Sequence, residues 1–358
     1  MNVLFITVRA DIGGGPEHLF QLLLHKPASV NAFVACPNDK PYRDRFESLV
    51  GRAHMTEVPH RAFSMRAFFD LARFIKTHKI DVVHSHGKGA GLYARLLRIV
   101  TGVRVVHTFH GLHIGDYGRA KRALYLGLER GLCRLTSTAI CVSKGEAALI
   151  RDNALIADQK RIVIDNGVAV PNEITRPIWD GGPLRLLAVN RYDYQKNPDL
   201  LIDIAAKLKP SIPFHLDVIG TGDRIDDIRA TIHTADLDDC VTIHGGVSTP
   251  RDYFRAAHVF VSTSRWEGMP LAVLEAMSEG LCVIATNVVG NNDVLRHGEN
   301  GLLFETVDQA ATQLIDLTPA LCATLSQQAR ADALDHYSAE VMAQKTYAAL
   351  TSALPSSL

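Results

Sequence analysis

Short runs of apolar, β-branched residues alternate along the chain with longer stretches in which apolar residues recur at helical spacing. The runs predict strands and the stretches between them predict amphipathic helices. Such an alternation is typical of right-handed crossovers and a mostly parallel, doubly wound sheet. In the first half, the predicted strands are residues 3–8, 30–36, 81–84, 103–108 and 138–142, and the predicted helices include 17–25, 65–78, 89–101 and 119–134.

The alternation stops over residues 171–183, which contain three prolines and no helical period, and this indicates a linker. It then resumes and predicts a second α/β domain. The predicted strands there are 184–190, 214–219, 241–244, 259–262 and 282–286, and the predicted helices are 197–208, 223–234, 250–256, 270–279 and 307–317, with a helical tail over 320–354. Two domains, residues 1–170 and 184–335, agree with a length of 358 residues, since one core rarely grows past about 250–300.

The overall composition excludes several classes of protein. A net charge of zero and a pI near 7.3 argue against a dedicated nucleic-acid binder. The six cysteines are scattered without a CxxC pair, which indicates reduced thiols in a cytoplasmic protein rather than a disulfide framework or a zinc site. We expect neither a signal peptide nor a transmembrane helix, because the chain shows no leader pattern and no uninterrupted apolar window of 18 residues.

Basic residues concentrate between residues 60 and 135, where fourteen lysines and arginines face only four acidic residues. Two interpretations stay open. The charges can cover solvated helix faces, or they can form a patch for anionic lipid head groups or a lipid diphosphate. Residues 118–128 favour the second, because basic and apolar side chains interleave there. On that interpretation, the protein contacts the inner face of the cytoplasmic membrane peripherally.

The segment 265–277 contains the sharpest chemical signal, a loop that leads into a helix. Pro270 suits the first helical position and Gly280 the residue that ends the helix, whereas Gly268 lets the backbone approach a ligand. The N–H groups of Gly268, Met269 and Leu271 would then face an anion at the positive end of the helix dipole.

Two carboxylates, Glu267 and Glu275, frame this loop and the helix. Eight helical residues span about 12 Å, whereas the carboxylates of a retaining glycoside hydrolase lie about 5–5.5 Å apart. The spacing therefore disfavours a hydrolase pair. It suits two carboxylates along a bound nucleotide sugar, with Glu275 accepting from ribose hydroxyls and Glu267 from the hydroxyls of the transferred sugar.

Two cations, Arg191 and Lys196, follow the first strand of the second domain. Cations at the carboxyl end of a strand can hold a diphosphate and stabilise the charge that develops on a leaving group without a metal ion. The alternative is a pair of surface salt bridges. In the first domain, the turn that contains Gly13, Gly14 and Gly15 follows the first strand, where it would admit a phosphate or a sugar.

Histidines follow two strands of the first domain. The edge at which these strands end is where open α/β sheets bind ligands, so we expect His84, His86 and Lys88 to contact the acceptor. The second group is His107, His110 and His113, whose spacing on a strand does not place three rings on one face, and no acidic residue completes a metal site. Of these three, His110 is best placed for function.

Together these segments resemble glycosyltransferase family 4 on the GT-B fold, over about residues 1–350. The E-x7-E motif falls on Glu267 and Glu275 within EGMPLAVLEAM, and the Arg-x4-Lys pair falls on Arg191 and Lys196. The family's Gly-rich loop and N-domain histidine fall on the first glycine turn and on His110. The residues expected to bind the donor are Gly14, Gly15, Arg191, Lys196, Gly220, Gly245, Glu267, Gly268, Met269, Leu271 and Glu275.

The resemblance implies a retaining transferase that needs no metal ion or other cofactor. A hexose or N-acetylhexosamine would pass from a UDP- or GDP-sugar to a glycan or polyprenyl-diphosphate-linked acceptor in cell-envelope polysaccharide assembly, lipopolysaccharide included. His110, Arg191, Lys196 and Glu267 would be the catalytic residues, and the donor phosphate itself would accept the proton of the acceptor. The helix over 336–358 would cross back onto the first domain.

The sequence departs from the family pattern at two places. Gly290 is followed by Asn291-Asn292-Asp293 where the family often has Pro-Glu, and Gly220-Thr221-Gly222-Asp223 replaces G-x-G-P. Because of both departures, the sequence does not specify which nucleobase the donor carries. Three other classes are the alternatives: an oxidoreductase, whose G-x-G-x-x-G fingerprint is absent from the sequence; a GT-B-type UDP-sugar epimerase, which would need no acceptor; and a nucleotide-sugar sensor without activity.

Overall fold

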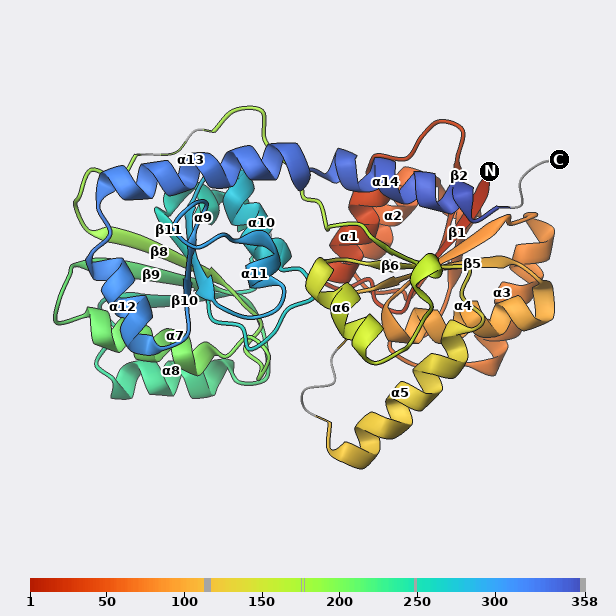
Figure 1. The fold of residues 1–358 in the computed structure, drawn as a ribbon, viewed down its shortest axis with the longest axis horizontal. Helices are drawn as coiled ribbons and strands as arrows, with labels where there is room; N and C mark the ends of the chain where they lie inside the picture. The colour runs from red at the N-terminus through yellow and green to blue at the C-terminus, as the bar shows by residue number, and fades with distance from the viewer. Residues whose placement is uncertain (113–116, 175, 177, 248–249, 355–358) are drawn as a thin grey trace. The chain divides into compact units, whose positions relative to one another are not determined.

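The chain forms two compact units in the computed structural model, which describes residues 1–112, 117–174, 176, 178–247 and 250–354. Unit 1 comprises residues 1–167 and 339–358, and unit 2 comprises residues 168–338. Each unit contains a parallel sheet with helices on both faces (Figure 1), so the predicted doubly wound α/β class is confirmed. His113 and Asp116 lie outside the described residues.

The sheet of unit 1 has seven parallel strands in the order β3-β2-β1-β4-β5-β6-β7. The order reverses between β1 and β4, which is the point where such sheets bind ligands. Its elements are β1 (Asn2–Thr7), α1 (Gly14–Leu24), β2 (Asn31–Cys36), α2 (Tyr42–Val50), β3 (Met55–Glu57), α3 (Met65–Thr77), β4 (Val82–His86), α4 (Gly87–Thr101), β5 (Arg104–Phe109), α5 (Arg119–Cys133), β6 (Thr138–Cys141), α6 (Lys144–Asp152) and β7 (Arg161–Val163).

Successive residues of β1 bury their side chains in two different cores, because side chains alternate across a strand. Val3 and Phe5 pack with α1, α2 and the last helix of the chain. Leu4 and Ile6 pack with α3 and α4 on the opposite face. Both faces of β1 are therefore covered, which explains why this strand is an unbroken apolar run.

Unit 2 repeats the plan with six parallel strands in the order β10-β9-β8-β11-β12-β13. Here the reversal lies between β8 and β11. Its elements are β8 (Leu184–Val189), α7 (Pro198–Leu208), β9 (Phe214–Ile219), α8 (Ile225–Thr234), β10 (Val241–Gly245), α9 (Pro250–Ala256), β11 (Val259–Ser262), α10 (Leu271–Ser278), β12 (Cys282–Thr286), α11 (Asn291–Val294), β13 (Leu302–Phe304), α12 (Val307–Ile315) and α13 (Pro319–His336).

The last helix, α14 (Ala339–Ser352), belongs to unit 1 although α13 directly before it belongs to unit 2. It packs on α1, and the Tyr347 hydroxyl donates to the Leu22 carbonyl at 2.8 Å. The chain passes between the units at residues 167–168 and 338–339, within three residues of the expected boundaries. Residues 171–183, expected as a linker, are part of unit 2, where Trp179 packs against the core.

Several short elements were not predicted. The strands β3, β7 and β13 have three residues each, too few to show an apolar alternation. The helix α2 has a polar sequence that buries only Tyr42 and Phe46. Secondary structure of this kind depends on neighbouring elements rather than on local pattern.

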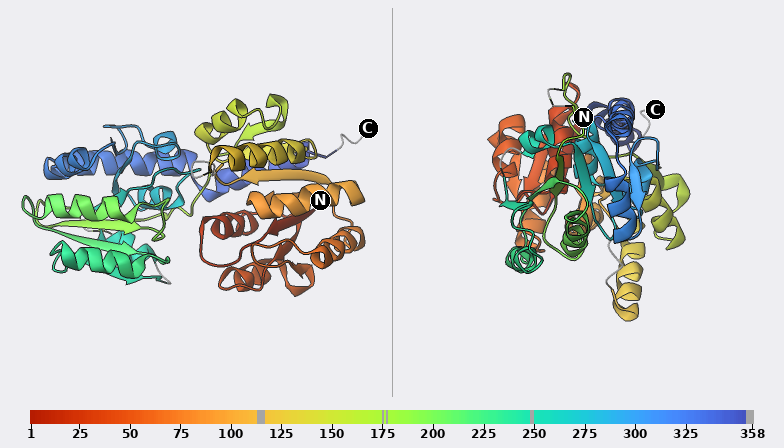
Figure 2. Two further views of the ribbon diagram at one scale, coloured as in Figure 1. Left: turned by 90° about the horizontal axis from the view of Figure 1, so that it is seen from below. Right: turned by 90° about the vertical axis from the view of Figure 1, so that its left-hand side faces the viewer.

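Helix α5 projects from the body of unit 1 in Figures 1 and 2, and a buried ion pair connects it to α4. The Arg95 guanidinium is fully buried and contacts the Glu129 carboxylate at 2.7 Å. The same guanidinium donates to the Thr136 hydroxyl at 3.0 Å. Two desolvated charges of opposite sign thus connect α4 to a helix that is largely exposed.

We expect Glu129→Gln to lower the free energy of unfolding by about 3–5 kcal/mol, because it leaves Arg95 buried without a counter-ion. The measurement is urea denaturation followed by circular dichroism. The double variant Arg95→Met/Glu129→Leu should recover much of the loss, because it removes both charges. If the double variant were as unstable as the single one, the pair would stabilise the fold through the packing of its side chains rather than through their charges.

Candidate functional site

The loops after β8 and β11 meet at the reversal point of the unit 2 sheet. Parallel strands end at the same edge, and these two strands are neighbours. The Arg265 amide donates to the Gln195 carbonyl at 2.8 Å, which joins the two loops. The loop after β8 contains the Arg191 to Lys196 segment, and the loop after β11 contains Glu267. The structure therefore brings two motifs together that lie about seventy residues apart in the sequence.

The Glu267 carboxylate is the centre of this site. Its Oε1 accepts from the Lys196 ammonium at 2.6 Å and from the Ser264 hydroxyl at 2.6 Å. The Gln195 amide donates to Oε2 at 3.5 Å. The Glu267 side chain is only 8% exposed and that of Lys196 is 17% exposed, so solvent screens this ion pair little. The arrangement fixes the position of one ammonium and one carboxylate before any ligand binds.

Gly290 makes room for Glu267. A Cβ at Gly290 would lie 2.5 Å from the Cβ of Glu267, and its φ of +92° lies in the left-handed region that favours glycine. The Glu267 amide donates to the Val289 carbonyl at 3.0 Å, so the loop after β11 contacts the loop after β12. The Asp293 carboxylate accepts from the Gly290 amide at 3.2 Å and so caps α11. Asp293, which stands where the sequence departs from the family's Pro-Glu, therefore has a structural role.

Arg191 lies at the solvent side of the same turn, with 46% of its side chain exposed. Its guanidinium donates to the Asp193 carboxylate at 2.7 Å and to the Gln195 side-chain carbonyl at 3.1 Å. The Asp193 carboxylate also accepts from the Lys196 amide at 3.0 Å. One carboxylate therefore holds the turn that presents both cations.

The helix α10 starts one residue later than predicted. Pro270 is its N-cap residue and Leu271 its first residue, and Gly280 has φ +71° directly after the C-cap residue Glu279. Gly268 and Met269 are buried before the helix, whereas Leu271 and Glu275 are partly exposed on it. The predicted ending of the helix at Gly280 is confirmed.

Gly220 is required by a close contact within the chain. A Cβ there would lie 1.5 Å from the Asn190 carbonyl oxygen, at the end of β8. The Gly220 amide donates to the Gly245 carbonyl at 2.8 Å, which connects the ends of β9 and β10. These glycines thus fix the edge of the sheet where the donor was expected, although their expected contact with the donor stays a prediction.

In unit 1, the glycine turn directly precedes α1. Gly13 is the N-cap residue, and the helix begins at Gly14. A Cβ built at Gly15 would meet no atom within 4 Å, so the backbone is accessible there. This openness is consistent with a ligand close to the first turn of α1.

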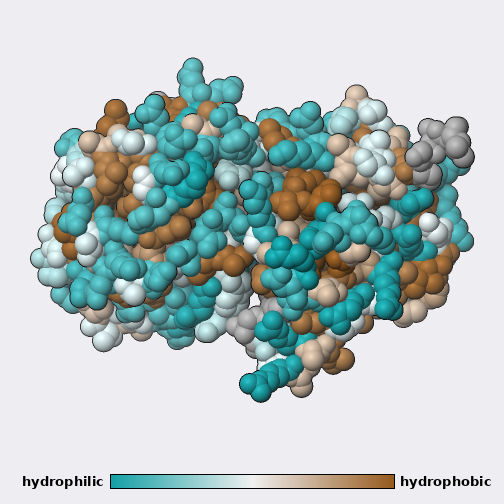
Figure 3. All heavy atoms as spheres, in the orientation of Figure 1, coloured by the Kyte–Doolittle hydropathy of each residue, from teal (hydrophilic) through white to brown (hydrophobic). Residues whose placement is uncertain are grey.

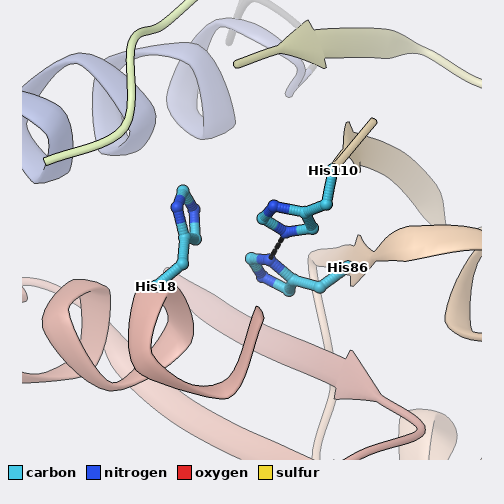
Figure 4. Close-up of side chains that lie close together, drawn as sticks. All are labelled: His18, His86 and His110. Carbon is cyan, nitrogen blue, oxygen red and sulfur yellow. Dashed lines mark hydrogen bonds between the residues drawn. The ribbon is translucent and has the colours of Figure 1, made fainter. Parts of the chain in front are cut away.

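Histidines from α1, β4 and β5 gather at the carboxyl edge of the same sheet. His86 ends β4 and His110 follows β5, and their Nδ1 and Nε2 atoms lie 3.2 Å apart in a hydrogen bond. The ring of His18, from α1, lies 4.8 Å from that of His110 and 5.4 Å from that of His86. Figure 4 shows the three rings facing a common space.

Two further histidines lie behind these three inside the sheet. His84 is fully buried and hydrogen-bonds the Thr108 hydroxyl at 2.7 Å, and His107 hydrogen-bonds the Ser85 hydroxyl at 2.9 Å. The ring centroids of His84 and His86 lie 4.2 Å apart, with the ring planes tilted by 46°. His84 was expected to contact the acceptor, but its buried side chain can only support the residues in front of it. Lys88, which was also expected to contact the acceptor, is exposed.

Burial keeps these imidazoles neutral. Desolvation lowers the pKa of His18 to about 4 and that of His84 to about 3. The pKa values of His86 and His107 lie well below the ordinary value, first because of burial and then because of neighbouring histidines, to which the Arg95 guanidinium is added for His107. Burial thus favours the neutral form of these four imidazoles.

Three residues of this site were missed by the sequence analysis. Glu146 is buried and accepts from the Gly111 amide at 2.5 Å and from the Val142 amide at 2.8 Å, so it fixes the loop that presents His110. Its signal was present, because Ser143 and Glu146 have the spacing of a capping box. His18 and Asn166 carried no signal, because only the tertiary fold joins residues 148 positions apart.

Comparison with known proteins agrees with this architecture. Residues 12–170 match the model of Glycosyltransferase Family 4, and residues 171–330 match that of Glycosyl transferases group 1. The chain is 30% identical over 309 residues to D-inositol 3-phosphate glycosyltransferase of Arthrobacter sp. (strain FB24), covering 78% of this chain and 72% of that protein. It is 29% identical to UDP-Gal:alpha-D-GlcNAc-diphosphoundecaprenol alpha-1,3-galactosyltransferase of Escherichia coli, covering 81% of this chain and 79% of that enzyme.

A solved structure shows the same fold over the whole length. HepE of Anabaena, in complex with UDP and glucose, superposes with a TM-score of 0.84 over 98% of this chain and 100% of its own, at 18% identity. The two family models together span nearly the whole chain, and one relative is 30% identical over most of both proteins. The chain is therefore a glycosyltransferase that belongs to family 4 and has the GT-B fold.

Proposed function

We propose that the protein is a retaining, metal-independent hexosyltransferase that uses a UDP- or GDP-sugar of a hexose or N-acetylhexosamine. The contact between Lys196 and Glu267 at the reversal point of unit 2 carries this proposal. An ammonium with three protons can donate one to Glu267 and the others to a diphosphate, so the pair orients a cation toward the leaving group. The complex of HepE with UDP and glucose supports a nucleotide sugar as donor.

The residues of each unit have a separate task in this mechanism. Arg191, Lys196 and the amides at the start of α10 stabilise the departing diphosphate, and Glu267 and Glu275 accept from donor hydroxyls. His110 lies near the transferred sugar, and His86 and Lys88 contact the acceptor. No residue acts as general base, because the donor phosphate takes the proton of the acceptor and the anomeric configuration is retained.

The acceptor proposed is a glycan or a polyprenyl-diphosphate-linked sugar in cell-envelope polysaccharide assembly. The related Escherichia coli proteins support this class, because their names specify a diphosphoundecaprenol-linked acceptor and O-antigen biosynthesis. A GT-B-type epimerase would release the nucleotide without an acceptor. Release of nucleoside diphosphate that depends on the acceptor separates the two activities.

A lipid-linked acceptor fits a peripheral contact with the inner face of the cytoplasmic membrane. Among the described residues, no helix has both the length and the apolar character needed to cross a bilayer. On α5, Leu124 is 76% and Leu128 is 59% exposed, and the basic residues Lys121 and Arg122 are exposed beside them. Hydrophilic and apolar side chains are interspersed along this projecting helix in Figure 3, which suits an anionic lipid surface.

The donor site is tested first by thermal unfolding with nucleoside diphosphates and nucleotide sugars, in chelator and without added metal. A ligand at 100 times its dissociation constant should add about 2.7 kcal/mol to the stability of the fold. We expect a shift with one nucleobase that persists in chelator. A shift that needs a divalent metal ion would contradict metal-independent donor binding.

We expect Lys196→Ala and Glu275→Ala each to lower kcat/KM at least about a hundredfold, because one preorganised contact to developing charge contributes about 2.7–4 kcal/mol. The measurement is acceptor-dependent release of nucleoside diphosphate. Lys207→Ala is the matched control, since Lys207 lies on α7, the helix that follows the Lys196 loop, and is paired with Asp308 at the surface. Near-normal turnover in either variant removes that residue from the mechanism.

The membrane contact predicts binding to anionic liposomes that weakens with salt and is absent with neutral liposomes. Replacing Arg119, Lys121 and Arg122 by serine should weaken binding by roughly a hundredfold, at about 1 kcal/mol for each charge near the surface. The control variant replaces Lys207, Arg229 and Lys345 by serine, which changes the net charge equally. Equal losses in the two triple variants would mean that α5 is not the contact.

A further inference from the structure

The three histidines His18, His86 and His110 bring one ring nitrogen each within 4.8 Å of one another (Figure 4). We propose that they form a binding site for a single divalent transition-metal ion, Zn²⁺ being the probe ion, inside unit 1. The donor chemistry described above does not use such an ion. When it is bound, the ion occupies His110 and inhibits sugar transfer, and this consequence alone rests on the proposed function.

The spacing of two of the ligands already matches zinc. Two nitrogens at 2.0–2.1 Å from a tetrahedral zinc ion lie about 3.3 Å from each other. The observed distance between His86 Nδ1 and His110 Nε2 is 3.2 Å. Insertion of the ion replaces one hydrogen bond by two metal–nitrogen bonds: the proton of the hydrogen bond moves to the other nitrogen of the donating ring, and both rings turn so that their lone pairs point at the ion. A shift of the His18 ring brings its Nε2 to the ion as the third ligand.

His18 is held in the tautomer that a metal site needs. Its Nδ1 lies 2.9 Å from the Asn166 side-chain carbonyl oxygen, and a carbonyl can only accept, so the proton is on Nδ1. The lone pair is then on Nε2, which is buried and has no hydrogen-bond partner among the residues that the structure describes. Metal-binding histidines commonly donate their other ring nitrogen to a carbonyl in this way.

A pocket and two charged side chains adjoin the proposed site. His110 is only partly buried and lines a pocket of about 150 Å³, together with Gly111 and Lys88. The ammonium of Lys88 opposes the ion, whereas the buried carboxylate of Glu146 beside Gly111 favours it.

A second group of residues could hold a metal ion by type and spacing: Asp11, Asp39 and His60. In this group the ligand atoms are already engaged in contacts within the protein. His60 Nδ1 already bonds Asp39 at 2.5 Å, and Asp11 forms an ion pair with Arg9 through both carboxylate oxygens. The Arg9 guanidinium thus occupies the place of a cation. This group serves as the internal control.

The test is a competition titration of the metal-free full chain with Zn²⁺ and a fluorescent zinc chelator. We expect one Zn²⁺ per chain, and at least about a hundredfold weaker binding in His18→Gln and in His86→Gln. Asn166→Leu should weaken binding about 10–100-fold, as loss of an outer hydrogen bond to a ligand does. His60→Gln should bind as the wild type does. Unchanged affinity in His18→Gln, or a loss in His60→Gln, would overturn the proposal.

A direct measurement covers the case in which a variant folds poorly. X-ray absorption at the zinc edge of the loaded wild-type protein should show nitrogen ligands at 2.0–2.1 Å and no sulfur at about 2.3 Å. Sulfur ligands would assign the ion to one of the six buried cysteines and refute the histidine site. Neither readout requires a sugar, so a chain that binds zinc at nitrogen but transfers no sugar would contradict the proposed function alone.

Discussion

The parallel arrangement of strands is the constraint on which the other features of this protein depend. In a parallel sheet every strand ends at the same edge, so the loops that follow neighbouring strands must meet there. In unit 2 this edge joins the turn after β8 to the loop after β11, and in unit 1 it joins the ends of β4 and β5 to the first turn of α1. Chemistry-bearing residues from distant parts of the chain therefore collect at two edges.

Charged groups at these edges are held by contacts that exist without ligand. Glu267 accepts from Lys196 and Ser264, and Asp193 holds the turn that presents Arg191. Side chains fixed in this way need little reorganisation when charge develops on a leaving group, and such preorganisation contributes strongly to catalysis. Gly290 also helps to fix the position of Glu267, since any side chain at residue 290 would displace it.

Unit 1 relies on neutral rings rather than charges. Five histidines at one edge would repel one another if they were protonated, and burial prevents this by lowering the pKa of four of them. The two fully buried rings are anchored by the hydroxyls of Thr108 and Ser85. The outer rings are thereby packed against a fixed layer at the carboxyl edge of the sheet, where His86 and His110 are hydrogen-bonded to each other.

The sequence by itself determined the doubly wound class, the two domains and most of the strands and helices, because these depend on local apolar periodicity. It also located Glu267 and Lys196, since each lies in a short motif after a strand. Only the tertiary structure decided that these two side chains touch, that His18 joins His86 and His110, and that Glu146 holds the loop beside them. The physical reason is that such contacts depend on strand order, which places residues close in space without leaving any pattern between them in the chain.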